Sequence, residues 1–313
     1  MLKFRVLCSA PLLLAQLFAL SVTLRAQEST AASALVTYRV VPSAIDSSVR
    51  RFNEPHYVVF DRAVKADAPL LLFLPGTGGR PQNTSDFANL AARQGYRVIG
   101  LEYVDTPAVA QICPREPDPD CSEKVRRKRI YGDDVTPLVD DRSEESIVAR
   151  LTALLMALDR EHPAEKWSQY LKDGKPDWAR FAVSGLSQGA GMAAYIAQKT
   201  PVARVVLFSS PWDNHGPRRT LAPWVMRGTG ATPAERWYGA YHSREATADV
   251  IARAYSALGI PSSHIHVFTQ EPAASTSTNP YHPSVVGNGA TPRAPDGTPV
   301  YLEEWRAMLG DAH

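Results

Sequence analysis

Cysteine is scarce in this sequence, and so is net charge of one sign. Three cysteines occur among 313 residues, and the formal net charge is +2 at neutral pH. The cysteine count excludes a disulfide-dense scaffold, and the charge balance excludes a strongly basic surface. The one basic run, Val125–Arg129, lies among acidic neighbours. That setting predicts a solvated loop and no nucleic-acid partner.

Long hydrophobic runs are absent beyond the start of the chain. Lys3 and Arg5 precede a nearly uncharged stretch at residues 6–24, which Arg25 and Ala26 follow. This order is typical of a secretory signal peptide, cleaved here after Ala26. A retained membrane anchor is the alternative, but polar residues interrupt the stretch. We expect a signal peptide at 1–26, a flexible mature N-terminus at 27–34, and a secreted or periplasmic protein without stable membrane insertion.

Removal of such a signal leaves two cysteines, Cys113 and Cys121, in the stretch CPREPDPDC. An oxidising compartment favours a disulfide between them. Two cysteines without a nearby histidine do not supply enough ligands for zinc. A nucleotide-binding glycine fingerprint is also missing after the first strands. We therefore expect neither a metal nor another cofactor.

Periodicity places the rest of the chain, residues 35–313, in one α/β domain. The run Leu70–Leu74 is continuously apolar, as in a strand buried on both faces. Strands and helices alternate, which predicts a mostly parallel central sheet flanked by helices. The expected strands are 36–41, 56–62, 70–74, 97–103, 180–184, 203–208, 236–241 and 264–268, and the expected helices are 85–92, 143–158 with Ser143 as its cap, the segment after Ser187, 247–258 and 302–309.

Residues 104–142 lack this periodicity and hold proline, aspartate, both cysteines and the basic run. They follow the carboxyl end of a strand, which is the ligand side of an open α/β sheet. We interpret them as a loop-rich insertion at the rim of the site, or a lid over it. A surface excursion without function is the alternative.

The stretch Gly185-Leu186-Ser187-Gln188-Gly189 joins an expected buried strand to an expected helix. A G-x-S-x-G pattern is weak alone, but in this position a sharp turn lifts the serine clear of the sheet. Gly185 and Gly189 remove Cβ atoms that would clash in such a turn. The start of the helix favours a developing oxyanion near Ser187. Ser187 is therefore the candidate nucleophile.

This stretch resembles the nucleophile elbow of the α/β-hydrolase superfamily, and residues 60–309 follow that fold in element order. The resemblance implies a secreted serine esterase or lipase with two backbone N–H groups forming an oxyanion hole. One would belong to Gln188, the residue after the nucleophile. The other would belong to Thr77, in the turn Pro75-Gly76-Thr77-Gly78-Gly79.

The fold also implies the chain order serine, acid, histidine. His282, in the loop NPYHPSVVG after the last strand, can then serve as the general base. For the acid we favour Glu245, after the strand at 236–241, over Asp213. Asp249 and Glu271 are less suited because one is expected on a helix and the other at the end of the last strand.

The expected reaction is cleavage of a carboxylic ester, either a small molecule or lipid-like, through an acyl-enzyme. A peptidase or an acyltransferase would use the same residues, and a non-catalytic binding protein with this fold is a further alternative. Several aromatic residues fall near strand ends and could line the site or serve packing, namely Trp212, Trp224, Trp237, Tyr238 and Tyr241.

Overall fold

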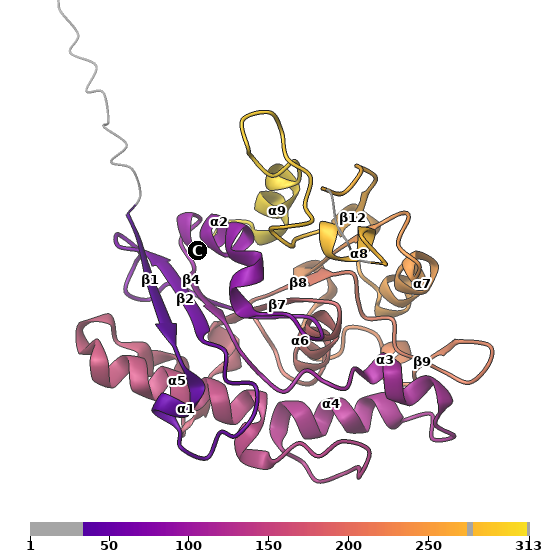
Figure 1. Cartoon of the computed structure of the whole chain (residues 1–313), viewed down its shortest axis with the longest axis horizontal. Helices are drawn as coiled ribbons and strands as arrows, with labels where there is room; N and C mark the ends of the chain where they lie inside the picture. The colour runs from indigo at the N-terminus through magenta and orange to yellow at the C-terminus, as the bar shows by residue number, and fades with distance from the viewer. Residues whose placement is uncertain (1–33, 274–277, 312–313) are drawn as a thin grey trace, which may run out of the picture. The chain divides into compact units, whose positions relative to one another are not determined.

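The apolar runs of the sequence form one eight-stranded sheet in a computed structural model that describes residues 34–273 and 278–311 (Figure 1). The predicted signal peptide lies outside these residues, as does nearly all of the predicted flexible N-terminus. The strands of the sheet are β1 (Leu35–Val40), β2 (His56–Asp61), β3 (Leu70–Leu74), β4 (Arg97–Gly100), β7 (Phe181–Leu186), β8 (Arg204–Phe208), β11 (Trp237–His242) and β12 (Ile265–Phe268).

The strand order across the sheet is β1-β2-β4-β3-β7-β8-β11-β12. β2 runs antiparallel to both of its neighbours, β1 and β4, and every other pair is parallel. The carboxyl ends of β3, β7, β8 and β11 therefore meet at one edge, where open α/β sheets bind their ligands. The mostly parallel sheet predicted from the sequence is confirmed, and its strand order is that of the α/β-hydrolase fold.

Alternate side chains of β3 point to opposite faces of the sheet. Leu70, Leu72 and Leu74 pack in the same cluster as α4, α5, α6 and α7, whereas Leu71 and Phe73 pack with α2 and α9. Both faces of the central strands are thus covered, which is why these strands read as continuous apolar runs. The helices are α1 (Pro42–Ile45), α2 (Ser85–Arg93), α3 (Val109–Ile112), α4 (Cys121–Tyr131), α5 (Ile147–Glu161), α6 (Gln188–Lys199), α7 (Ala248–Leu258), α8 (Tyr281–Ser284) and α9 (Leu302–Leu309).

The basic run is helical, so the predicted solvated loop is wrong. Residues 125–129 lie within α4, and Arg126 and Arg129 are almost fully buried in ion pairs with Asp213 and Asp141. The helix ends at Gly132, which adopts a left-handed φ of 81°. The predicted disulfide is present and joins Cys113 to Cys121, the first residue of α4.

Two smaller expectations are also corrected. Ser143 does not cap α5, because residues 143–145 form a separate 3-10 turn and the helix begins at Ile147. Its cap is Ser146, whose hydroxyl accepts from the backbone N–H of Ala149. His282 lies on the one-turn helix α8, not in a loop.

The remaining strands are short: β5 (Leu171–Lys172) pairs with β6 (Lys175–Pro176), and β9 (Asn214–His215) pairs with β10 (Thr220–Leu221). Within residues 34–273 and 278–311, no helix is both long enough and apolar enough to cross a membrane.

Candidate active site

Ser187 stands in a strained turn between β7 and α6. Its φ is 56° and its ψ is −121°, a conformation that costs a non-glycine residue of order 1–3 kcal/mol. The backbone N–H of Ser187 donates to the carbonyl of Phe208 at the end of β8, at 2.9 Å. The surrounding sheet therefore holds the serine in a conformation that it would not adopt alone.

Three glycines make this turn possible. A Cβ on Gly189 would lie 2.0 Å from the carbonyl oxygen of Leu74, and one on Gly185 would lie 2.4 Å from the carbonyl carbon of Gly189. Gly76, in the turn after β3, approaches so closely that its Cβ would lie 3.1 Å from the Cβ of Ser187. Only glycine allows β3, β7 and α6 to meet at this distance.

His282 and Glu245 form a direct contact at the same edge of the sheet. The Nδ1 atom of His282 lies 2.6 Å from Oε2 of Glu245. Because a carboxylate only accepts, we assign the ring hydrogen to Nδ1, which leaves Nε2 as the acceptor of the neutral ring. Ser187 and His282 both line one cleft of about 1120 Å³.

The carboxylate of Glu245 is fully buried and fixed on both oxygens. Its Oε1 atom accepts from the hydroxyl of Ser209 at 2.8 Å and from the backbone N–H of His242 at 3.0 Å. A buried carboxylate needs such donors because an unpaired buried polar group is costly. The sequence did not predict a role for Ser209 or His242, because neither residue lies in a recognisable motif. The positive φ of Ser209 (52°) is visible only in the structure.

Asp213, the alternative acid, lies in a different set of contacts. Its two oxygens accept from Nε and Nη2 of Arg126 at 2.7 and 2.6 Å, and Oδ2 also accepts from the indole N–H of Trp224 at 2.8 Å. Two further acids were considered from the sequence. Glu271 pairs with Arg244 and accepts from Tyr281, and Asp249 lies in the first turn of α7. Of the acids considered from the sequence, Glu245 is the one placed against His282.

Thr77 and Gln188, the two predicted oxyanion donors, both lie beside Ser187. Thr77 lines the cleft beside Ser187, and both Thr77 and Gln188 line a small recess that also reaches Ser187. Gln188 is the first residue of α6, so its N–H lies at the positive end of the helix.

The side chain of Gln188 ties the insertion to the nucleophile turn. Its Oε1 accepts from the backbone N–H of Val109 at 2.7 Å, and its Nε2 donates to the carbonyl of Asp105. Residues 104–142 are therefore attached directly to the residue that follows Ser187.

A metal ion is not suggested by the side chains of this edge. Over the part of the chain that the structure describes, no group of three or more His, Cys, Asp or Glu side chains is arranged to hold one. The groups that the structure gathers here are a hydroxyl, an imidazole and a carboxylate.

These features define a protein of the α/β-hydrolase fold with a serine at its strained elbow. The assignment of the fold rests on the strand order and on the turn at Ser187. No family model matches the sequence, and no curated protein matches it.

Several solved structures are similar to the chain. A protein assigned as a dienelactone hydrolase from Klebsiella pneumoniae is 13% identical, with a TM-score of 0.42 over 88% of this chain and 98% of that one. A bacterial heroin esterase is 18% identical, with a TM-score of 0.42 over 78% and 77%. A promiscuous phosphotriesterase from metagenomic libraries, itself like dienelactone hydrolase, is 14% identical, with a TM-score of 0.40 over 88% and 96%.

Proposed function

We propose that this protein is an exported serine hydrolase that cleaves carboxylic esters through Ser187, His282 and Glu245. The observation that carries the proposal is the 2.6 Å contact between His282 and the buried carboxylate of Glu245, in the cleft that Ser187 also lines. A serine hydroxyl is a weak nucleophile unless a neighbouring base takes its proton, and an oriented imidazole is such a base.

The proposed reaction has two halves. Nε2 of His282 takes the hydroxyl proton as Oγ of Ser187 bonds to the ester carbonyl carbon, and Glu245 stabilises the imidazolium. The backbone N–H groups of Thr77 and Gln188 donate to the oxyanion. Collapse breaks the bond to the alkoxy oxygen, which leaves with the proton from His282. Water, deprotonated by the same ring, then attacks the acyl-enzyme and restores Ser187.

Export is part of the proposal and is supported by two features. The first 26 residues have the order of a secretory signal peptide. The Cys113–Cys121 disulfide is of a kind that persists in oxidising compartments. Mass spectrometry of the exported chain should find a new N-terminus near residue 27; an intact Met1 on the exported protein would contradict cleavage.

The test of the mechanism is a panel of aryl esters of graded acyl length. Ser187→Ala, His282→Ala and Glu245→Ala should remain folded by circular dichroism and lose several orders of magnitude in kcat. Asp213→Ala is the matched acid control, and its folded fraction should keep esterase activity because Asp213 contacts Arg126 and Trp224. Full activity in Ser187→Ala would refute the mechanism. Peptide and acyl-acceptor substrates, assayed in parallel, separate peptidase and acyltransferase activity from ester hydrolysis.

A further inference from the structure

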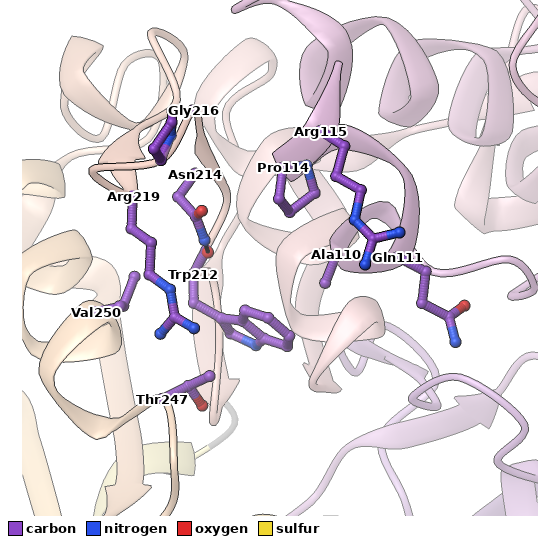
Figure 2. Close-up of a pocket in the computed structure, with 11 residues that line it drawn as sticks. Ala110, Gln111, Pro114, Arg115, Trp212, Asn214, Gly216, Arg219, Thr247 and Val250 are labelled. Atoms are coloured by element: carbon purple, nitrogen blue, oxygen red, sulfur yellow. Dashed lines mark hydrogen bonds between the residues drawn. The ribbon is translucent and has the colours of Figure 1, made fainter.

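A second pocket opens beside the cleft, between the insertion and the segment that follows β8 (Figure 2). Its volume is about 530 Å³, within the range of small-molecule sites. One wall comes from residues 110–115 and the other from residues 212–219, with Thr247 and Val250 of the α7 region closing one side. We call this the side pocket.

Two arginines from opposite walls give the side pocket its charge. Arg115 follows the α3 segment, and Arg219 precedes β10; Figure 2 shows the indole of Trp212 between them. Both side chains are exposed, and neither forms an ion pair with any described residue. The lining residues include no aspartate or glutamate. The side pocket is thus a locally positive site in a protein of nearly balanced charge.

The unpaired state of these arginines contrasts with that of arginines nearby. Arg126, Arg127 and Arg129 of α4 each pair with an aspartate of this chain. A guanidinium is planar and carries several N–H donors, which match the two oxygens of a carboxylate. Arg115 and Arg219 keep these donors available to a ligand.

The side pocket adjoins the cleft. Trp212 and Gln111 line both spaces. Trp212 and Ala110 also border the small recess that reaches Ser187. Because the spaces share these lining residues, we expect a molecule whose carbonyl lies at Ser187 to extend past Trp212 and place a second group between the arginines. An indole face suits an aromatic or apolar part between the two groups.

We propose that the side pocket binds a carboxylate carried by the same ester that Ser187 attacks, so that the preferred substrates are acidic esters such as monoesters of aromatic dicarboxylic acids. This inference rests on the proposed function, because it names the substrate class of that site. Arg115 and Arg219 select the substrate through its charge, and Trp212 contacts the part that links carboxylate and ester.

The test compares two esters that differ only in charge, with the full-length chain. One is the mono-4-nitrophenyl ester of benzene-1,4-dicarboxylic acid, and the other is the same ester with its free carboxylate methylated. The wild type should favour the acidic ester by about tenfold in kcat/KM at low salt, as expected for two exposed charge pairs, and the preference should shrink as salt is added. The double variant Arg115→Gln/Arg219→Gln should lose the preference through KM and keep its rate on the neutral ester.

Arg218→Gln is the matched control, because Arg218 is exposed and adjacent to Arg219 but does not line the side pocket. It should leave the preference intact. The side pocket assignment is overturned if the wild type treats both esters alike, if Arg218→Gln has the effect of the double variant, or if an ester bearing phosphonate in place of the carboxylate is favoured over the acidic ester.

A binding measurement separates failure of this inference from failure of the proposed function. Benzene-1,4-dicarboxylate is titrated calorimetrically into Ser187→Ala and into the same variant with Arg115→Gln/Arg219→Gln. Binding that is lost only with the arginines supports the side pocket, whether or not either ester is hydrolysed. If esters are hydrolysed without charge preference and the dicarboxylate does not bind, the proposed function stands and the assignment of the side pocket as a carboxylate site is refuted.

Discussion

At the scale of single residues, the candidate site is held by contacts that fix both carboxylate oxygens of Glu245. One carboxylate oxygen faces the imidazole, and the other accepts from Ser209 and from the backbone of His242. Rotation of the carboxylate would break these hydrogen bonds in a buried setting, where unpaired polar groups cost of order 1–3 kcal/mol. The orientation of His282 therefore depends on a serine that no motif identifies.

Ser209→Ala tests this dependence. The variant removes the hydroxyl that donates to Glu245. Alanine also has a Cβ, so the residue at this position of positive φ keeps the same backbone strain. We expect kcat on aryl esters to fall by roughly 10- to 100-fold with little change in KM, because a hydrogen bond to a charged group is worth about 1.5–3 kcal/mol.

Ser284→Ala is the control for Ser209→Ala. Ser284 is also buried and lies in the same one-turn helix as His282, but its hydroxyl donates to the carbonyl of Tyr281 and not to Glu245. Its kcat should stay close to that of the wild type. Equal losses in the two variants would show that general loosening, not the carboxylate contact, sets the rate.

A second residue-scale prediction concerns Glu102, which is 4% exposed. Burial, with the Asp105 carboxylate adding to it, raises the pKa of Glu102 to about 7. In the unfolded chain the pKa is about 4.3. Between these values the folded protein binds the extra proton, so this residue makes stability fall as pH rises from about 4 to 7.

Glu102→Gln removes that dependence because the amide stays neutral. Relative to wild type, the melting temperature of the variant should rise by at least roughly 2–4 °C on going from pH 5 to pH 8. The exposed Glu235→Gln is the control and should follow the wild type at both pH values. A difference between Glu102→Gln and wild type that does not change with pH would contradict the assignment.

At the scale of elements, α4 shows why a basic sequence can belong to a core. Its buried positions are Cys121, Ser122, Val125, Arg126, Arg129 and Ile130, which follow helical spacing along one face. Two of these positions are arginines, which interrupt the apolar stripe. For this reason the sequence pattern predicts a loop. Each buried arginine is neutralised by an aspartate from outside the helix.

The Arg126–Asp213 pair joins α4 to α6 and to the segment after β8. Arg126 lies so close to α6 that a Cβ on Gly191 would be 2.2 Å from its Nη2 atom. Its Nη1 atom also donates to the carbonyl of Gln188, at 3.4 Å. A helix of the insertion is thus packed directly behind the turn that carries Ser187.

Arg126→Met should be strongly destabilising, because it leaves the buried Asp213 carboxylate without its cationic partner. The expected loss is about 3–5 kcal/mol in the free energy of unfolding, measured in urea. The double variant Arg126→Met/Asp213→Asn should recover part of it. Arg127→Met is the matched control, since Arg127 pairs with Asp133 at the surface, and it should cost at most about 1 kcal/mol. Similar losses in the two single variants would contradict the importance of burial.

At the scale of the described fold, we expect the insertion to act as a fixed wall of the site. Its buried attachments are the Gln188 side chain to Val109 and Asp105 and the Arg126–Asp213 pair. These contacts are buried, and opening them would separate the Arg126–Asp213 ion pair. The interpretation of residues 104–142 as a rim or a lid stays a prediction, and these buried contacts favour the rim.

A fixed wall predicts simple kinetics on poorly soluble esters. The rate should follow one hyperbolic curve as the concentration of a short-chain triacylglycerol passes its solubility limit, because no lid has to open at a lipid surface. A sharp rise in rate when an emulsion forms would contradict the fixed wall. Initial rates on either side of the solubility limit provide the measurement.

Local pattern was sufficient for much of this protein. The strands and most helices follow from apolar runs and helical spacing, which are properties of neighbouring residues. The turn at Ser187 follows from two glycines placed between a buried strand and a helix. His282 is predicted as the base from the serine, acid, histidine order of the fold that the sequence resembles. This prediction needs only the order of the elements along the chain.

Tertiary structure alone decided which charges meet. Asp213 and Glu245 both follow strands in the sequence, but one reaches Arg126, 87 residues earlier, and the other reaches His282, 37 residues later. The same reason explains why the sequence did not predict the helix α4 or the side pocket. Both depend on arginines, and segments distant in the chain determine whether those arginines have a charged partner. Periodicity reports which side of an element is apolar, whereas the pairing of charges is a property of three-dimensional distance.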